Sequence, residues 1–378
     1  MKVNVKALRG ALKAMNMVVE KRNTIPLLSC VMIDGGPSQM TLTATDLDLE
    51  ISKVIDLEEP GKNKAAQFCV DAGTLEGIAR KLPADGVVTM EAGAKGDRAV
   101  TVSCGRSRFR LPTLPTEDFP RIAADGRWSA QFEQSRADLI AMLHHVAFAA
   151  GTEDARYYLC GVYVHVPSDS EAMIAAATNG YRLARFHVDA PEGSADLAGI
   201  ILPSKAVGVI EAMLDEEGGA ADVAMSAAKF RFEIGATTLT GKAIDGQFPD
   251  YNRVIPTGNR TAAWFEPGPL AQAVDRVLTI SSDKTRLIAM EWAADRVTLR
   301  VTSLEHGEAS EDVPCDLTGD AVRIGFNGRY LLDVLNKLKA MGEEGARVQV
   351  LLGDAAGPTL WRQSDEARAL YVLMPMRV

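Results

Sequence analysis

The sequence repeats one pattern three times, and this repetition limits what the chain can fold into. Each copy opens with an amphipathic helical segment, and a second helical segment with a Leu-rich face follows further along. The opening segments begin at Val3, Phe132 and Phe265, and the second segments begin at Val70, Leu202 and Phe326. A period of roughly 125 to 130 residues is that of whole domains rather than of solenoid units. Three copies of one domain favour a symmetric assembly over a single catalytic pocket.

Proline-rich stretches mark the ends of the first two copies. The first copy closes with LPTLPTEDFPRI, residues 111–122, and the second closes with DGQFPDYNRVIP, residues 245–256. Because proline disfavours helices and central strands, both stretches are predicted to be exposed connectors. We therefore expect three domains, at residues 1–127, 128–260 and 261–378.

Outside the helical segments, apolar and polar residues alternate in runs separated by glycine-containing turns, as in antiparallel strands with one buried face. The run TLTATDLDLEISKVIDL predicts one such strand. Its two faces carry Leu47, Leu49 and Ile51 on one side and Asp46, Asp48 and Glu50 on the other. The three carboxylates are interpreted as a solvated face of this strand. Each copy is predicted to be an α+β domain with sheets on one side and two helices on the other.

The charge of the chain is unevenly distributed. The overall net charge of −9 is unusual for a nucleic-acid-binding protein, but the three copies carry +2, −7 and −4 in turn. Opposite charges steer association and select partners. The asymmetry therefore suits a head-to-tail contact between the basic first copy and an acidic one.

Composition excludes several classes of protein. The chain has no apolar run of about 18 residues, and its N-terminus lacks the features of a signal peptide, so we expect a cytoplasmic protein without a membrane span. Its five cysteines are scattered and odd in number. They are predicted to be reduced, buried thiols rather than a disulfide framework.

No catalytic constellation stands out in the sequence. The glycine-rich phosphate loops, nucleophile elbows and zinc motifs of common enzymes are missing from it. His144 and His145 are adjacent, so on a helix they diverge by about 100° and cannot both face one metal ion. The spacing of Cys160 and His165 would direct them to opposite faces of a strand. We therefore predict no catalytic residues, no metal and no cofactor.

Five short motifs resemble one known family. They are SCGRSRFRLPTLP from Ser103, RYYLCG from Arg156, ATNGYRLA from Ala177, QFPDYNRVIP from Gln247 and the terminal YVLMPMRV. Together, in order and over essentially the whole chain, they resemble bacterial sliding clamps, the beta subunits of the DNA polymerase III holoenzyme. The resemblance implies a DNA polymerase processivity factor that is not itself an enzyme.

The resemblance also implies an assembly. Two protomers, each with three clamp-type domains of two inner helices and outer antiparallel sheets, would join head to tail into a six-domain ring. Twelve inner helices spaced by about 9 Å would enclose a hole of about 25 Å, which passes a duplex of roughly 20 Å. The implied partners are a second copy, double-stranded DNA bound without sequence specificity, the replicative polymerase, the clamp loader, and other polymerases and repair proteins.

Cationic and aromatic residues are the candidates for contact with DNA. Those on the predicted inner helices are Lys6, Arg9, Lys13, Arg80, Lys81, Arg136, Lys205, Arg276, Lys337 and Lys339. By resemblance, the residues expected nearest to DNA are Arg22, Arg80, Tyr157, Tyr158 and Lys205. Glu153 stands where the family has a polar residue, and a carboxylate facing phosphate would be unfavourable.

The second expected site is a groove between the second and third copies that binds short peptides of partner proteins. By resemblance it is formed by Arg156, Leu159, Thr178, Gly180, Tyr181, Arg182, Leu183, Pro249, Arg253, Val254, Asn327, Tyr330, Val372, Leu373, Met374, Pro375, Met376 and Arg377. An apolar cleft with arginines at its rim suits aliphatic and aromatic anchors. Tyr181, Ala356 and Pro358 depart from the family pattern, so the peptide preference is expected to differ.

The third expected site is the contact between protomers. By resemblance, a basic edge strand of the first copy meets an acidic edge of the third copy around an apolar centre. The expected residues are Arg106, Arg108, Phe109, Leu111, Ile280, Glu305, Glu308 and Glu311.

Two alternatives remain open from the sequence. One is a divergent clamp-like paralogue that acts in repair or on a plasmid, which peptide affinities would distinguish. The other is an unrelated enzyme built from repeated domains, which a turnover assay would reveal.

Overall fold

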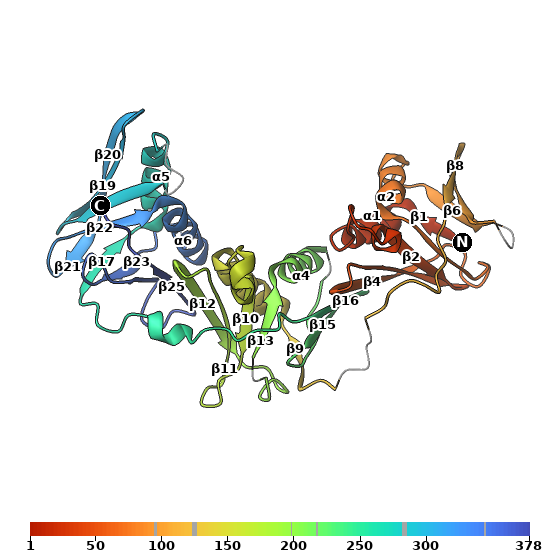
Figure 1. Ribbon diagram of the computed structural model, residues 1–378, viewed down its shortest axis with the longest axis horizontal. Coiled ribbons are helices and arrows are strands. Elements are labelled where there is room, and N and C mark those ends of the chain that lie inside the picture. The colour runs from red at the N-terminus through yellow and green to blue at the C-terminus, as the bar shows by residue number, and fades with distance from the viewer. Residues whose placement is uncertain (94–96, 123–126, 198, 217, 282–285, 344) are drawn as a thin grey trace. The chain divides into compact units, whose positions relative to one another are not determined.

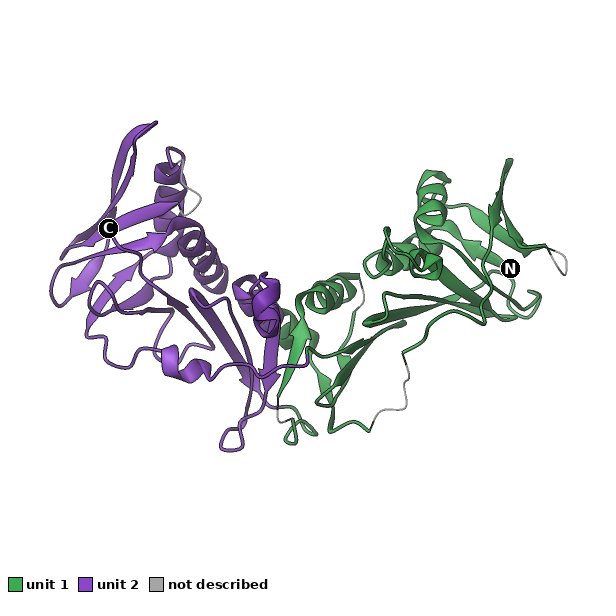
Figure 2. Ribbon diagram, in the orientation of Figure 1, with its two compact units in different colours: residues 1–140, 191–244 green, residues 141–190, 245–378 purple. Residues whose placement is uncertain are grey.

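The structure is a computed structural model that describes residues 1–378 except 94–96, 123–126, 198, 217, 282–285 and 344. The described chain divides into two compact units, drawn in different colours in Figure 2. Unit 1 comprises Met1–Ile140 and Pro191–Ile244, and unit 2 comprises Ala141–Ala190 and Asp245–Val378. Both units combine helices with antiparallel sheets (Figure 1), so the predicted α+β class is confirmed.

Unit 1 contains two sheets. One runs β1-β6-β7-β8, and the other runs β5-β2-β3-β4-β16-β15-β14-β9. Helices α1 and α2 pack against each other, and α1 lies over β3 and β4. The elements are β1 (Lys2–Asn4), α1 (Val5–Met15), the 3₁₀ helix η1 (Pro26–Ser29), β2 (Cys30–Gly35), β3 (Gln39–Thr45), β4 (Leu49–Asp56), β5 (Ala66–Asp71), α2 (Ala72–Lys81), β6 (Val87–Ala92), β7 (Ala99–Cys104), β8 (Ser107–Pro112), β9 (Ala130–Gln134), β13 (Ile200–Pro203), α4 (Ser204–Glu216), β14 (Ala221–Met225), β15 (Lys229–Ile234) and β16 (Thr237–Lys242).

Unit 2 likewise pairs helices with two sheets. One sheet runs β20-β19-β18-β22, and the other includes the run β10-β11-β12-β25-β24-β23-β17-β21. Helix α3 (Arg136–Val146) begins in unit 1 and ends in unit 2. The remaining elements are η2 (Ala147–Ala149), η3 (Asp154–Leu159), β10 (Gly161–His165), β11 (Ala172–Thr178), β12 (Arg182–Asp189), η4 (Tyr251–Val254), β17 (Thr261–Phe265), α5 (Pro267–Leu278), β18 (Leu287–Trp292), β19 (Arg296–Ser303), β20 (Gly307–Pro314), β21 (Asp316–Thr318), β22 (Val322–Asn327), α6 (Gly328–Met341), β23 (Val348–Leu352), β24 (Thr359–Arg362) and β25 (Ala369–Leu373).

Sheet pairing joins successive copies of the repeat within each unit. In unit 1, β4 pairs with β16, with Ile51 opposite Leu239. In unit 2, β12 pairs with β25, with Leu183 opposite Val372. Because these shared sheets hold parts of two copies together, the two units do not coincide with the three sequence copies. The three-domain division stays a prediction.

The six predicted helical segments are confirmed, although each begins after a short strand that we had merged with the helix. Side chains at the strand ends explain the later start. Asn4, Asp71 and Asn327 each accept a hydrogen bond from a backbone N–H of the helix that follows. Such capping satisfies N–H groups that have no partner within the helix, so the helix begins at the next residue.

The single strand predicted around residues 46–50 was wrong. The chain turns at Asp46–Asp48 between β3 and β4, where Leu47 has a φ of 80°. The Asp46 carboxylate closes this turn by accepting hydrogen bonds from the N–H groups of Asp48 and Leu49, at 3.0 and 2.6 Å. Its other oxygen lies 2.5 Å from Lys205 Nζ, and its side chain is only 6% exposed. Local side-chain bonds at the turn therefore outweigh the alternating pattern.

We expect Asp46→Ala to lower the free energy of unfolding by about 2 kcal/mol, since it removes several hydrogen bonds to a buried charge. Asp48→Ala is the matched control, because the Asp48 side chain is 74% exposed and pairs with Lys242 on the surface. That control should change stability by less than about 0.5 kcal/mol. Urea unfolding compares the two; equal effects would contradict a structural role for Asp46.

The two proline-rich connectors are less exposed than predicted. In the first, Leu114 pairs with Cys69, and Phe119 joins a buried cluster with Cys30 and Cys69. Glu50, expected on a solvated face, is buried and accepts hydrogen bonds from Arg121 Nε and Ile122 N. In the second connector, Phe248 and Tyr251 are buried. Apolar side chains on both connectors are thus packed against the sheets, which proline content alone could not indicate.

No helix within the described ranges is both long enough and apolar enough to cross a bilayer. The described histidines, cysteines and carboxylates do not gather in threes as a metal site would require. His145 is instead buried and hydrogen-bonds through Nδ1 with the Tyr371 hydroxyl at 2.8 Å.

Candidate binding site

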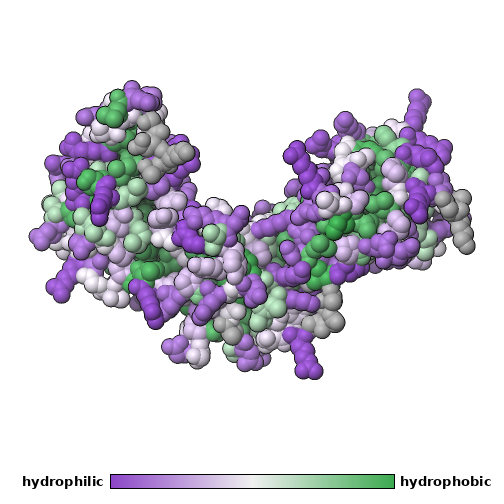
Figure 3. Space-filling model, in the orientation of Figure 1, coloured by the Kyte–Doolittle hydropathy of each residue, from purple (hydrophilic) through white to green (hydrophobic). Residues whose placement is uncertain are grey.

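An apolar cavity of about 200 Å³ lies in unit 2 where several segments meet. The pairing of β12 with β25 brings the turn after β11 beside the C-terminal strand, and η3 and η4 close the sides. Its lining residues are Leu159, Thr178, Gly180, Arg182, Leu183, Pro249, Asp250, Tyr251, Val254, Val372 and Met374. Val254 and Met374 are among the few large hydrophobic side chains left exposed in the described chain. Figure 3 shows one face of the molecule, on which hydrophilic and hydrophobic residues are interspersed.

The turn between β11 and β12 is held by its own side chains. The Thr178 hydroxyl donates to the Arg182 carbonyl at 2.7 Å, and Asn179 Oδ1 accepts from the N–H groups of Tyr181 and Arg182. Gly180 has a φ of +88°, and a Cβ there would lie 2.8 Å from Arg156 Nη1. The backbone conformation therefore favours glycine here, whereas the flexible end of Arg156 could shift to admit a Cβ.

Arg182 forms a fixed wall of the cavity. Its guanidinium lies 2.5 Å from Asp333 Oδ2 and donates a second hydrogen bond to the Phe148 carbonyl. It also stacks over the rings of Phe148 and Tyr330, at 5.0 and 4.4 Å from their centroids. With its side chain only 10% exposed, Arg182 has little freedom to move when a ligand binds.

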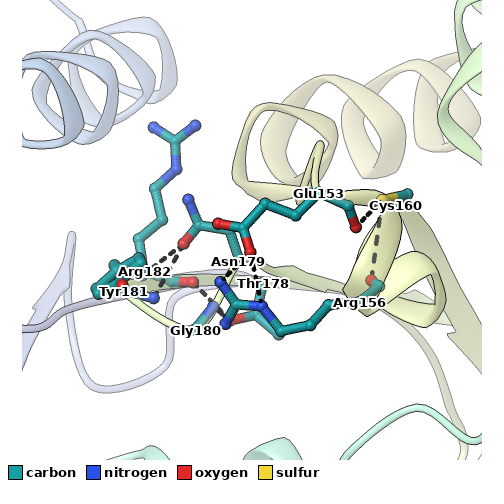
Figure 4. A network of polar contacts seen from close by, with 8 residues as sticks. All are labelled: Glu153, Arg156, Cys160, Thr178, Asn179, Gly180, Tyr181 and Arg182. Carbon is teal, nitrogen blue, oxygen red and sulfur yellow. Dashed lines mark hydrogen bonds and ion pairs between the residues drawn. The ribbon is translucent and has the colours of Figure 1, made fainter.

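A second cavity, of about 220 Å³, adjoins the first and is more polar. The two cavities share Leu159 and Arg182. Its other lining residues are Ala150, Gly151, Thr152, Glu153, Arg156, Asn179, Tyr181 and Tyr330. Figure 4 shows Arg156 and Glu153 directed toward each other beside the turn at Gly180. The Arg156 guanidinium donates two hydrogen bonds to Glu153 Oε2, at 3.1 and 2.8 Å.

Most residues of the expected groove line one of these cavities, and six do not. Asn327 caps α6, and Arg253 pairs with Asp250 while its side chain remains 85% exposed. Leu373 is buried and follows Val372 in β25, so its side chain lies on the opposite face of the strand from that of Val372, which pairs with Leu183. The other three that lie outside the linings are Pro375, Met376 and Arg377.

Several lining residues were not predicted from the sequence. Asp250 and Asn179 were assigned to no site, and Glu153 was considered in relation to DNA rather than to a cavity. A signal for two of them was present. Asp250 and Asn179 are polar residues at tight turns inside motifs that we had already singled out. Turn residues of this kind place side chains at the mouths of sites.

The residues expected near DNA are distributed over both units. Arg22, Arg80 and Lys205 lie in unit 1, and Tyr157 and Tyr158, whose rings meet edge to face, lie in unit 2. Arg22, Arg80 and Tyr157 are exposed. Lys205 donates to the Val18 carbonyl at 2.9 Å and to Asp46, so it also ties α4 to the end of α1.

Two of the candidate helix arginines have a structural role that we did not predict. Arg9 donates to the carbonyls of Ala79, Arg80 and Leu82 at the C-terminal end of α2. Arg136 donates to the Leu214 carbonyl near the C-terminal end of α4, at 2.8 Å. A cation at a helix C-terminus donates hydrogen bonds to carbonyls that have no partner within the helix, and it interacts favourably with the negative end of the helix dipole. These guanidinium groups therefore serve neighbouring helix ends.

Most of the residues expected at the protomer contact lie on, or in turns beside, strands that end their sheets. Arg106, Arg108, Phe109 and Leu111 lie in the β7–β8 hairpin, and β8 stands last in its sheet. Glu308 and Glu311 lie on β20, which ends the sheet of β18, β19 and β22, and Glu305 lies in the turn before it. Ile280 lies two residues after the end of α5. Glu311 also pairs within its own chain with Arg276, at 2.5 Å.

Comparison with known proteins gives the family. Models of the N-terminal, central and C-terminal domains of the DNA polymerase III beta subunit match residues 1–123, 134–250 and 252–377. The chain belongs to this family. Beta sliding clamps from Caulobacter vibrioides and Pseudomonas putida are 39% and 32% identical to it, over 98% of each chain.

Solved structures agree with this family. A sliding clamp from Bartonella birtlesii bound to griselimycin superposes with a TM-score of 0.93 at 36% identity, covering 100% of this chain and 99% of that one. A Caulobacter crescentus beta sliding clamp with bound polyethylene glycol gives 0.92 at 38% identity, with the same coverage. As a member of the sliding clamp family, the chain functions in DNA replication as a processivity factor of DNA polymerase III.

Proposed function

We propose that two copies of this chain close into a ring that encircles duplex DNA and carries no catalytic site. The observation that supports closure most directly is the charge on the two sheet-ending strands. β8 carries Arg108 and Arg110, with Arg106 in the turn before it, whereas β20 carries Glu308, Glu311 and Asp312. Edge strands of opposite charge can pair head to tail, and such pairing leaves no open sheet edge. The expected apolar centre is Phe109, Leu111 and Ile280.

In this proposal each protomer contributes three domains, at residues 1–127, 128–260 and 261–378. The residues that contact DNA are the exposed Arg22, Arg80 and Tyr157, together with Tyr158 and Lys205. Contacts of this kind engage phosphates and carry no sequence information, which suits a ring that must slide. As part of the replication machinery, the ring would act in the cytoplasm.

The cavity pair of unit 2 is proposed as the site for short peptides of the replicative polymerase, the clamp loader and repair proteins. An aliphatic or aromatic anchor would enter the apolar cavity between Leu183, Val254 and Met374. A peptide of modest affinity suffices, because tethering to DNA raises the effective concentration of the polymerase. A processive polymerase therefore requires no chemistry from the ring itself.

Retention on DNA tests ring closure. The protein is loaded with a clamp loader onto a nicked circular plasmid, and bound protein is separated by gel filtration before and after the plasmid is cut once. We expect stable retention on the circle and loss from the linear form. Equal retention on both forms would contradict topological binding, as would its absence from the circle.

A charge-reversed variant tests the contact. Arg106→Glu combined with Arg108→Glu should reduce retention on the circle by at least about tenfold, since like charges would face each other across the contact. Lys62→Glu combined with Lys64→Glu is the matched control, because both lysines are exposed, belong to unit 1 and, like the two arginines, are two residues apart, but lie before β5 rather than at β8. If both double variants lose retention equally, bulk charge rather than the β8 edge is responsible.

A further inference from the structure

The charges that line the polar cavity influence which peptides the site accepts. This inference rests on the proposed peptide-binding function. Two guanidinium groups line this cavity, those of Arg156 and Arg182. Each is already paired with a carboxylate of the protein, Arg156 with Glu153 and Arg182 with Asp333. The cavity therefore offers hydrogen-bond donors whose positive charge is already compensated.

Glu153 is held in position by its surroundings. It precedes η3, and its carbonyl accepts hydrogen bonds from Arg156 N at 3.0 Å and from Cys160 Sγ at 3.5 Å. Both guanidinium bonds of Arg156 go to the same carboxylate oxygen. The side-chain hydrogen bonding to Glu153, more than any other effect, raises the pKa of Arg156, which agrees with this pairing. Figure 4 shows this network, whose residues Glu153 and Arg156 line the polar cavity.

The other side of Arg156 is also occupied. Its guanidinium lies 6.0 Å from the centroid of the Tyr181 ring and close to Gly180. A ligand side chain entering the cavity therefore meets Arg156 with the Glu153 carboxylate next to it. An amide or hydroxyl can share donors of Arg156 without a charge penalty, whereas a carboxylate would be placed beside a second carboxylate, which repels it.

We infer that Glu153 is a specificity-determining residue of the peptide site. It makes the polar cavity accept an uncharged hydrogen-bonding side chain and disfavour an acidic one. Because the Glu153 side chain is 61% exposed, water and salt screen the repulsion, and the discrimination is of order 5- to 10-fold rather than absolute.

Paired peptides test this inference. Labelled peptides share one aliphatic–aromatic anchor for the apolar cavity and differ only in Gln against Glu, placed in turn at each of the four positions before the anchor. Affinities are measured by fluorescence anisotropy at low and high salt. For wild-type protein we expect one position at which Gln binds about 5- to 10-fold more tightly than Glu, with a smaller ratio at high salt.

Three variants separate the explanations. Glu153→Gln should bring the ratio near one by improving binding of the Glu peptide, and Glu153→Asp should retain part of the discrimination. Asp365→Asn is the matched control, since Asp365 also pairs with an arginine three residues away, Arg362, but lines neither cavity. It should leave the ratio unchanged.

The outcomes are distinct. If the peptides bind and the ratio in Glu153→Gln equals that of wild type, the inference is wrong while the proposed function stands. A ratio that shifts equally in Asp365→Asn would also overturn it, because a general change of charge would then explain the result. If no peptide of the set binds wild-type protein, the proposed peptide site fails, and the inference fails with it.

Discussion

Removal of the last five residues, Met374–Val378, is expected to weaken binding of clamp-binding peptides by more than about 100-fold, as expected when a central anchor contact of an interface is lost. Met374 lines the apolar cavity, and its N–H donates to the Tyr181 carbonyl at 2.9 Å. Met376 N–H donates to the Gly325 carbonyl at 2.8 Å, which fixes the tail against β22. The deletion thus removes one wall of the cavity and the bond that aligns the turn at Tyr181.

Fluorescence anisotropy with a labelled peptide measures this loss. Sedimentation at low protein concentration should show the same association state as the wild type, because the tail contacts β22, at the opposite end of its sheet from β20. Far-ultraviolet circular dichroism should keep its shape. Peptide affinity within about threefold of wild type would contradict the assignment of the groove.

Acid is expected to destabilise unit 2 through two histidines, the buried His145 and the partly buried His165. Burial, with smaller contributions from His144 and Lys337, lowers the pKa of His145 to about 4. Burial, and secondarily Arg185, lowers the pKa of His165 to about 4 as well. In the unfolded chain both would titrate near 6.5. Between these values the unfolded state binds more protons, so stability is full above pH 6.5 and falls as the pH drops toward 4.

Each histidine should lower the free energy of unfolding at pH 4.5 by about 2 to 3 kcal/mol relative to its value at pH 7. His145 uses Nδ1 toward Tyr371, and His165 uses Nε2 toward Tyr251, both at 2.8 Å. Asn at 145 and Gln at 165 can keep those bonds without titrating in this range. His145→Asn with His165→Gln should therefore flatten the pH dependence.

Tryptophan fluorescence during urea unfolding gives the measurement, since Trp264, Trp292 and Trp361 lie in unit 2. The control is His306→Asn, at an exposed histidine of the same unit. A double variant that loses as much stability between pH 7 and 4.5 as the wild type would contradict this account, and carboxylates would then be the groups responsible.

Local chemistry explains why much of the fold could be predicted. The helices follow from apolar residues at helical spacing, such as Val5, Leu8 and Leu12, which are buried on one face of α1. Caps such as Asn327 are also local. The turn at Asp46 was not predicted, because it depends on hydrogen bonds of one side chain. Over these few residues the alternation of apolar and polar residues still resembles that of a strand.

The candidate site was predictable only in part. Motifs located Arg156, Gly180 and Met374, each of which lies at a cavity. Neither spacing nor composition indicated that Glu153 would pair with Arg156. Nor did they indicate that Arg9 and Arg136 would donate hydrogen bonds to carbonyls near the C-terminal ends of neighbouring helices. Such contacts depend on side-chain direction in three dimensions, which sequence spacing does not specify.

By itself, the sequence determined the threefold repeat, the helices and the family, because periodicity, capping and short motifs are read along the chain. Only the tertiary structure decided where successive copies join, through β4 with β16 and β12 with β25, and which side chains share a cavity. The physical reason is that strand register is set by long-range pairing and packing, where residues distant in sequence become neighbours in space.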